Sequence, residues 1–217
     1  VNLHGEQHKS RRMLETKVFR RDFFKYYESE VFPQTLRETL NPFVEAGKMD
    51  LVDFGYRVMV NLTADFTGID RQEKSPEETA ELMRLLRIFG KTATLAHATG
   101  DKDAVKEEAF EALERFDQRF VKPSITRRFD LLGKWERGEI SEDAVPRDIL
   151  AVLLRNEDGI DMPRDVLTRE MAFFALAGAH TSIHTLTHAV HELFGWLESR
   201  PEDKQLVLED PRFIQKC

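Results

Sequence analysis

The sequence predicts an all-α fold, and three observations support this prediction. The 217 residues include only 11 glycines and 8 prolines, fewer than the roughly 12% that the two residues reach together in average proteins. Apolar residues recur at helical spacing between the prolines, and few stretches show the alternation of strands. The window 164–199 contains no proline and predicts a long helix.

The composition bounds the class of protein. Hydrophobic residues make up 41% of the chain and include 16 phenylalanines, which supply the core of one folded domain and exclude disorder. No run of about 20 apolar residues exists, so we expect no membrane span. The net charge of −7 makes the chain a poor general binder of nucleic acid. The one cysteine, Cys217, can form neither an internal disulfide nor a thiolate zinc site, which favours a reducing, cytoplasmic setting.

Start and stop signals divide the chain into helices. Ser75 followed by a proline and two glutamates is typical of a helix start, and we expect this helix over 77–98. Residues 101–135 predict one or two further helices with a break at Pro123. A short helix is expected over 147–156.

A central helix is expected over about 164–197. At 1.5 Å per residue its 34 or so residues span roughly 50 Å, enough to cross a whole domain. Its middle, 171–179, is almost entirely apolar, so we expect that part to be buried on all sides.

Four of the seven histidines form a row on this helix: His180, His184, His188 and His191. Neighbouring pairs at i,i+4 can chelate a metal, but the row rises about 16 Å along the helix, too far for one ion. A metal site would need ligands from another helix. The alternative is that the imidazoles contact a polar interior or a neighbouring helix.

A glycine stands in the middle of the same helix, within Ala177-Gly178-Ala179-His180-Thr181-Ser182. Glycine costs about 1 kcal/mol there relative to alanine, so a compensating role is expected. Its missing side chain lets a flat or diatomic ligand approach, and the Thr181 hydroxyl can bond the Ala177 carbonyl, open the helix and admit water. The alternative is a close helix crossing, and on chemistry alone this alternative is favoured.

The first helix carries His8 and Arg12 at i,i+4, two donors on one face that suit a carboxylate or phosphate. Residues 1–25 hold seven Lys and Arg against three Asp and Glu. This basic end is either a solvated helix face or a site for an anionic group or acidic partner.

Taken together, these segments resemble the middle of a cytochrome P450, a heme-thiolate monooxygenase. Gly5, His8 and Arg12 match the Gly-x-x-His-x-x-x-Arg helix near the heme propionates of that family, and 177–182 match its central Ala/Gly-Gly-x-Asp/Glu-Thr-Thr/Ser motif. The likeness covers essentially the whole chain and implies a partial P450 domain over 1–217. Weaker matches lie at 49–70, 148–154 and 201–202.

The resemblance assigns roles to six residues. His8 and Arg12 would hold the propionates of heme b. Ala177 and Gly178 would pass over the heme face where oxygen binds. Thr181, with His180 and water, would deliver protons for cleavage of the O–O bond. His180 replaces the usual acid of the motif, as in the sterol demethylase branch of the family.

The resemblance also implies partners and missing parts. The iron ligand would be a cysteine in a glycine-rich loop outside this chain, not Cys217, and the N-terminal part of the family fold is expected to be absent as well. Residues 82–98 would form part of a lid over an apolar small-molecule substrate. The basic first helix would dock an acidic electron donor of the ferredoxin or reductase type. Two other functions stay open: a helical metal-binding protein that uses the histidine row, and a non-catalytic helical interaction module.

Overall fold

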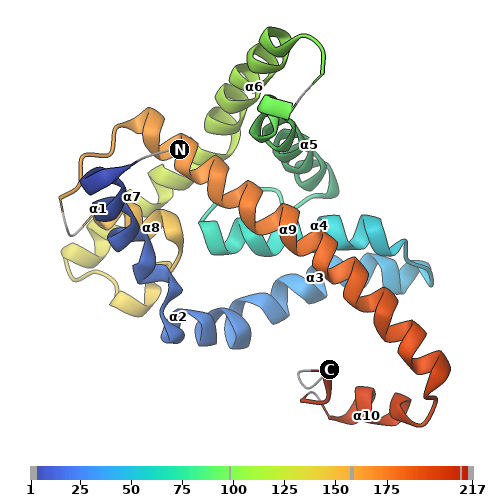
Figure 1. Ribbon diagram of the computed structural model, residues 1–217. Helices are drawn as coiled ribbons and strands as arrows, with labels where there is room; N and C mark the ends of the chain where they lie inside the picture. Colours follow the sequence, from blue (N-terminus) through green and yellow to red (C-terminus); the bar gives the residue numbers. More distant parts are fainter. Residues whose placement is uncertain (1–3, 98, 157–158, 211, 215–217) are drawn as a thin grey trace.

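The computed structural model describes residues 4–97, 99–156, 159–210 and 212–214 (Figure 1). Every regular element in this part of the chain is helical, so the all-α prediction is confirmed. The α-helices are α1 (Gly5–Glu15), α2 (Arg21–Tyr26), α3 (Phe32–Ala46), α4 (Leu51–Thr67), α5 (Pro76–Ala93), α6 (Lys102–Phe116), α7 (Lys122–Glu136), α8 (Ile149–Arg155), α9 (Arg164–Ser199) and α10 (Asp203–Glu209). Short 3₁₀ or π turns occupy η1 (Thr16–Phe19), η2 (Tyr27–Val31), η3 (Leu95–His97), η4 (Asp117–Val121) and η5 (Glu142–Ala144).

Side-chain caps fix where helices begin. The Ser75 hydroxyl accepts a hydrogen bond from the Glu78 amide, which confirms the predicted start of α5. Asp148 caps α8 by accepting from the Ala151 amide, one of the donors that a helix start leaves unpaired. The helix expected over 77–98 ends earlier, at Ala93, and η3 follows.

The break expected at Pro123 is wrong. The helical path continues from α6 through the π turn η4 into α7, and Pro123 lies in the first turn of α7. Pro33 follows the π turn η2 at the start of α3 in the same way. Proline lacks an amide donor and crowds the carbonyl four residues back, and a wider π turn just before it takes up this mismatch.

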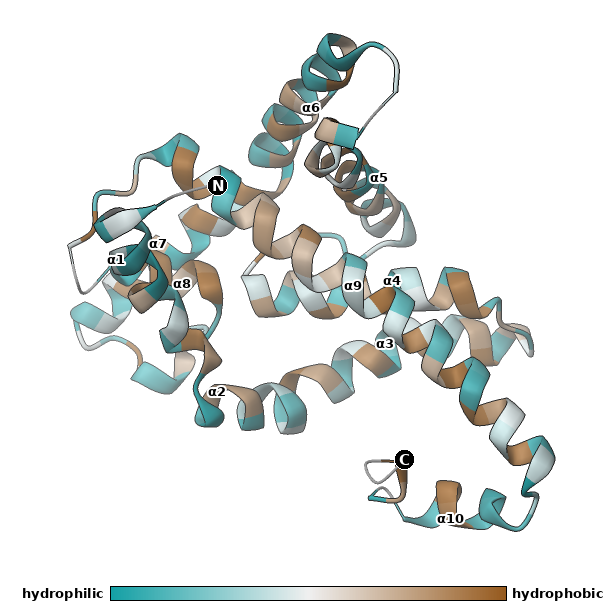
Figure 2. Cartoon of the chain, in the orientation of Figure 1, coloured by the Kyte–Doolittle hydropathy of each residue, from teal (hydrophilic) through white to brown (hydrophobic). Residues whose placement is uncertain are grey.

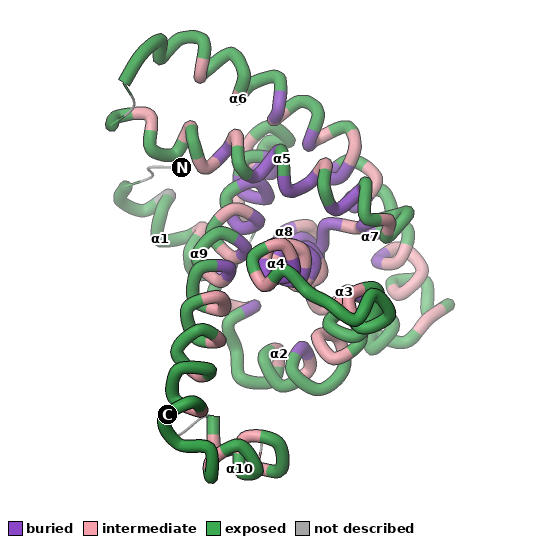
Figure 3. The backbone as a smooth tube through the Cα atoms, turned by 90° about the vertical axis from the view of Figure 1, so that its right-hand side faces the viewer, coloured by how far each residue is buried: buried purple, intermediate pink, exposed green. Residues whose placement is uncertain are grey.

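Helix α9 crosses the molecule as predicted and extends over 36 residues (Figure 1). Helix α4 lies against it in the antiparallel direction, because Gly178 of α9 faces Thr63 whereas Thr187 faces Gly55. Buried residues are concentrated in α4, α5, α8 and the first half of α9, while the second half of α9 and α10 are mostly exposed (Figure 3).

The core is built from large side chains of several helices. Phe116, Phe120, Leu85, Leu150 and Met171 have no measurable exposure. The hydropathy pattern agrees: hydrophobic residues run along α8 and the first half of α9, whereas α1 is mostly hydrophilic (Figure 2). α1 therefore depends on polar contacts as well as on the buried Leu14 to stay in place.

A buried ion-pair network joins α7 to α8 and to the loop after α4. Arg128 is only 3% exposed and donates to both carboxylate oxygens of Asp148 and to Asp70 at 2.6 Å. Gly68 lies in the left-handed region at φ 85°, and a Cβ there would approach an Asp148 oxygen to 2.3 Å. The close approach of chain and carboxylate explains why glycine is needed at this turn.

Candidate functional site

One face of α9 is open in its first half. The prediction that 171–179 is buried on all sides holds for Met171 and Phe174, but Phe173 is 41% exposed and Ala177 is exposed. The reason is that α4, α5 and α6 pack against only part of the circumference of α9. The side of α9 that faces away from these three helices is therefore exposed.

The helical period shows which residues share this open side. Glu170, Ala177, Thr181 and His188 are separated by 7, 4 and 7 residues, so at 100° per residue they lie within an arc of about 40°. Ala177, Thr181 and His188 are exposed, whereas Glu170 is buried. The open face thus begins two turns beyond Glu170.

Glu170 is buried because α1 is bound to it. The Arg11 guanidinium donates to the Glu170 carboxylate at 2.6 Å, and both side chains are largely shielded from solvent. Since Glu170 is on the same side of α9 as Ala177 and Thr181, this ion pair fixes α1 beside the start of the open face. The structure therefore places α1 next to α9 at Glu170, two helical turns before Ala177.

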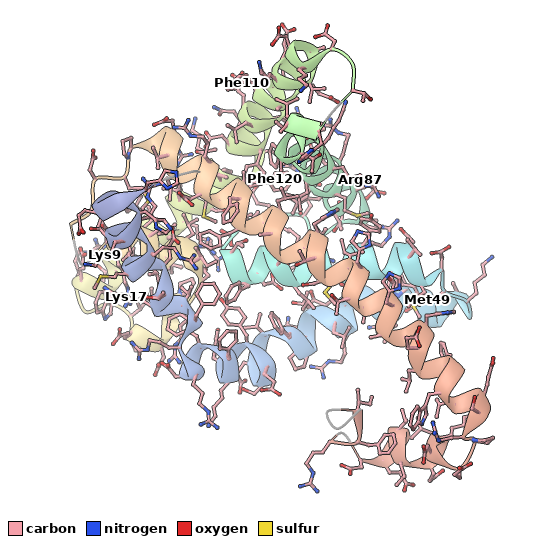
Figure 4. The ribbon with its side chains drawn as sticks, in the orientation of Figure 1. Lys9, Lys17, Met49, Arg87, Phe110 and Phe120 are labelled. Carbon is pink, nitrogen blue, oxygen red and sulfur yellow. The ribbon has the colours of Figure 1, made fainter. Side chains whose placement is uncertain are left out.

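The predicted anion-binding pair is accessible on α1. His8 and Arg12 are both exposed and share a helix face. Arg12 has a protein partner that sequence reasoning missed: it donates to the Glu15 carboxylate at 3.2 Å. Lys9 and Lys17 lie along the same α1–η1 segment and make it basic (Figure 4).

Glu15 is a buried carboxylate at the end of α1, with only 4% of its surface exposed. Burial raises the pKa of the Glu15 carboxyl above its ordinary value, and the negative charge of Glu170 adds to the rise. The guanidinium groups of Arg12 and Arg11 act in the opposite direction. Two carboxylates and two guanidinium groups therefore form one balanced cluster where α1 meets α9.

The Thr181 hydroxyl donates to the Ala177 carbonyl at 2.8 Å, as expected from their spacing. The opened helix turn that we expected with this bond is absent: α9 is a continuous α-helix through this region. A threonine can bond the carbonyl four residues back within regular geometry, and Thr185 and Thr187 do so as well.

Gly178 points away from the open face and toward α4. A Cβ at this position would lie 2.8 Å from Thr63 Cγ2, closer than a real side-chain contact permits. This is the close helix crossing that we weighed as the alternative explanation of the glycine. Of the two residues predicted to contact a ligand, Gly178 faces α4. The predicted contact therefore depends on Ala177 and on the backbone beside it.

The histidine row is exposed along α9, so the expected contact of its imidazoles with a polar interior is wrong. The His180 and His184 rings meet edge to face, with centroids 5.1 Å apart. Among the residues that the structure describes, no group of three or more His, Cys, Asp or Glu side chains is arranged to hold a metal ion. The metal-binding alternative gains no support from this geometry.

An apolar groove of about 440 Å³ lies between α5, α6 and α9, next to the open face. Phe89 and Ala93 of α5, Phe110 of α6, and Phe173 and Leu176 of α9 line it. Phe110 is exposed near the upper end of the molecule (Figure 4). The groove includes part of the expected lid over 82–98, whose residue 98 lies outside the described residues, as does Cys217.

Sequence reasoning identified the exposed donors and missed the residues that place them. Arg11, Glu15 and Glu170 lie where α1 meets α9, yet in the sequence they are ordinary charged residues of two predicted helices. Only Glu15 carried a local signal, since it lies three residues after Arg12. Nothing in the sequence connects Arg11 with a residue more than 150 positions away.

Comparison with known proteins adds no assignment: no family model matches the chain, and no curated protein matches it either. Within the described ranges, no helix has both the length and the apolar character needed to cross a bilayer.

Proposed function

We propose that this chain provides the heme-binding and oxygen-facing helices of a cytochrome P450-type monooxygenase, which oxidises an apolar small molecule with O₂ and electrons from a ferredoxin or reductase-type donor. One observation carries the proposal. The Arg11–Glu170 ion pair brings α1 to the side of α9 that exposes Ala177 and Thr181. A flat cofactor against that face would have the α1 donors at its edge.

The residues present fit heme b. His8 and Arg12 would hold the propionates by charge-assisted hydrogen bonds, since both are exposed on one face of α1. Ala177 is small and exposed, so it permits a planar ring to lie close to α9. The bound heme would supply the iron at which oxygen is activated, with the thiolate ligand that the resemblance assigns to a cysteine outside this chain.

The proton-moving groups would be Thr181 and His180. The Thr181 Oγ1 atom donates to the Ala177 carbonyl, so its lone pairs are available to accept a hydrogen bond from water. His180 is exposed one residue earlier, and an imidazole both binds and releases protons near neutral pH. Together they would pass protons from solvent to the open face.

The apolar groove beside the open face suits the substrate class. Phe89, Phe110 and Phe173 present aromatic surface within about 440 Å³, a size that suits a small apolar molecule. The basic α1–η1 segment, with Lys9 68% exposed, would attract an acidic electron donor. We place such an enzyme in the cytoplasm.

The direct test is spectroscopic and uses the protein purified at full length from its natural source. After reduction and exposure to carbon monoxide, we expect the red-shifted absorption band of a thiolate-ligated heme. A well-folded full-length protein without this band, and without bound porphyrin by extraction, overturns the proposed function. Elemental analysis of the same sample detects zinc or iron without porphyrin, the result that the histidine-row alternative requires.

A further inference from the structure

A cleft of about 670 Å³ lies where the end of α4 and the loop after it meet the start of α7 and the loop before α8. We call it the α4–α7 cleft. Tyr26 of α2 and Tyr27 and Val31 of η2 line its remaining side. None of the described residues that line it belongs to α1 or α9, so this cleft is separate from the proposed heme site.

Arg71 is a buried cation in the wall of this cleft, and most of its hydrogen-bond donors are unused. Its side chain is only 4% exposed, and its Nη2 atom donates to the Asp65 carboxylate at 3.3 Å. A guanidinium has several N–H donors, yet within the described part of the chain this bond is the one that the Arg71 side chain makes. The Nε donor is buried without a partner, whereas the unpartnered Nη1 group keeps contact with solvent. An acceptor in the cleft can therefore bind Arg71 while the Asp65 bond remains.

The chain around Arg71 is held in one shape. Asp65 is fixed on its other side, because its second carboxylate oxygen accepts from the Thr35 hydroxyl. The buried Glu78 carboxylate accepts from the successive amides of residues 72–74. These bonds hold the loop directly after Arg71, in which Lys74 has a left-handed φ of 49°. A ligand would thus meet donors that are already in place, which lowers the entropic cost of binding.

The other cations of the cleft have carboxylate partners. These pairs are Lys74 with Glu38, Arg127 with Asp70, Arg128 with Asp70 and Asp148, and Arg147 with Asp143. Positive and negative charges around the cleft are therefore nearly balanced, so a polyanion is disfavoured. A single carboxylate suits the cleft better, because its two oxygens match the planar donors of one guanidinium and the bond is charge-assisted.

We propose that the α4–α7 cleft binds a small organic acid, whose carboxylate accepts hydrogen bonds from Arg71. The body of the ligand lies against Tyr26, Pro123 and Pro146, which also line the cleft. The volume of the cleft exceeds that of a carboxylate group alone and is in the range of sites for small molecules. This inference goes beyond the proposed function and does not depend on it, because the residues assigned to heme take no part.

The test measures binding of acetate to the 217-residue chain by NMR at constant ionic strength. We expect acetate to shift the Arg71 Nε–H resonance in a saturable manner, because a bond at Nη1 changes the electron distribution of the whole guanidinium. Arg71→Gln identifies this resonance by its disappearance. Acetamide has nearly the same shape without the charge and should bind at least about tenfold more weakly.

Three variants locate the binding. Saturation transfer to the acetate methyl group needs no protein resonance, and we expect it to be lost in Arg71→Gln. Ala144→Trp fills the cleft from an exposed position and leaves Arg71 in place, so it should abolish binding in a folded chain. Ala189→Trp adds the same ring on α9, outside the cleft, and should bind acetate like the parent.

The absence of a saturable shift in the parent overturns the inference, and so does equal binding of acetate by Ala144→Trp and the parent. Acetamide that binds as tightly as acetate overturns the assignment of the ligand as a carboxylate. Heme plays no part in these measurements, so their failure leaves the proposed function standing.

Discussion

Arg11 on α1 and Glu170 on α9 are 159 residues apart in the chain and meet in a hydrogen-bonded ion pair of 2.6 Å. This single contact ties the helix with the predicted propionate donors to the helix with the predicted oxygen-facing residues. Helix α1 is hydrophilic overall and packs on α8, and this ion pair joins it to α9. We expect the stability of the chain and its proposed activity to depend on this pair.

Removal of one partner should therefore be costly. Glu170→Ala leaves the shielded Arg11 guanidinium without a partner, and we expect a loss of about 3 kcal/mol in the free energy of unfolding. Urea unfolding followed by circular dichroism measures it. Glu139→Ala, in the exposed pair with Arg137, is the matched control and should leave the midpoint unchanged. Equal midpoints for the two variants would contradict the anchoring role.

The buried Glu15 predicts a pH-dependent stability. Its pKa is raised in the folded state above the ordinary value of 4.5, so its favourable contribution is complete below 4.5 and is lost as the pH rises through the folded-state pKa. Glu15→Gln removes that loss. The variant should thus be more stable than the parent near pH 7, with the difference disappearing below about pH 4.5. Thermal unfolding across this range measures it, and a constant difference would refute the assignment.

Substitution of Gly178 tests whether the crossing of α4 and α9 requires a glycine at this position. Gly178→Ala introduces a methyl group against Thr63 and should destabilise the chain by about 1–3 kcal/mol, although alanine is the better helix former. Thr63→Ala in the same chain removes the clashing atoms and should restore most of the loss. If the glycine served only a ligand, Gly178→Ala alone would instead stabilise the ligand-free chain by about 1 kcal/mol.

The Arg128 network predicts a large loss away from the site. Arg128→Met leaves the buried Asp148 and the partly buried Asp70 without this donor, and we expect a cost of about 3–5 kcal/mol. Arg127→Met is a suitable control, because Arg127 binds the same Asp70 from a 58% exposed position and should cost at most about 1 kcal/mol. Chemical denaturation of both variants compares them directly.

Local signals in the sequence predicted the helices well. The Ser75 cap, the proline-free window and the short helix expected over 147–156 each depend on residues within one or two turns. Pro123 misled the prediction because a π turn takes up the proline, and a widened turn is not visible in a pattern of apolar residues.

The site was predictable only in part. The exposed donors His8 and Arg12, and the open-face residues Ala177 and Thr181, stand at motif spacings within single helices. Their relative placement depends on the pairing of Arg11 with Glu170, which follows from tertiary packing, including that of α1 on α8, and not from any local pattern. The orientation of Gly178 toward Thr63 likewise depends on the crossing of α4 and α9.

Equilibrium binding of heme to the 217-residue chain tests the central claim most directly. Ala177→Trp places a bulky ring on the open face, whereas Ala189→Trp places it on another exposed side of the same helix, about 80–120° away around the axis. The account predicts one heme per chain for the parent and for Ala189→Trp, with binding lost in Ala177→Trp. Absence of heme binding in the parent, or equal binding in all three proteins, would contradict it.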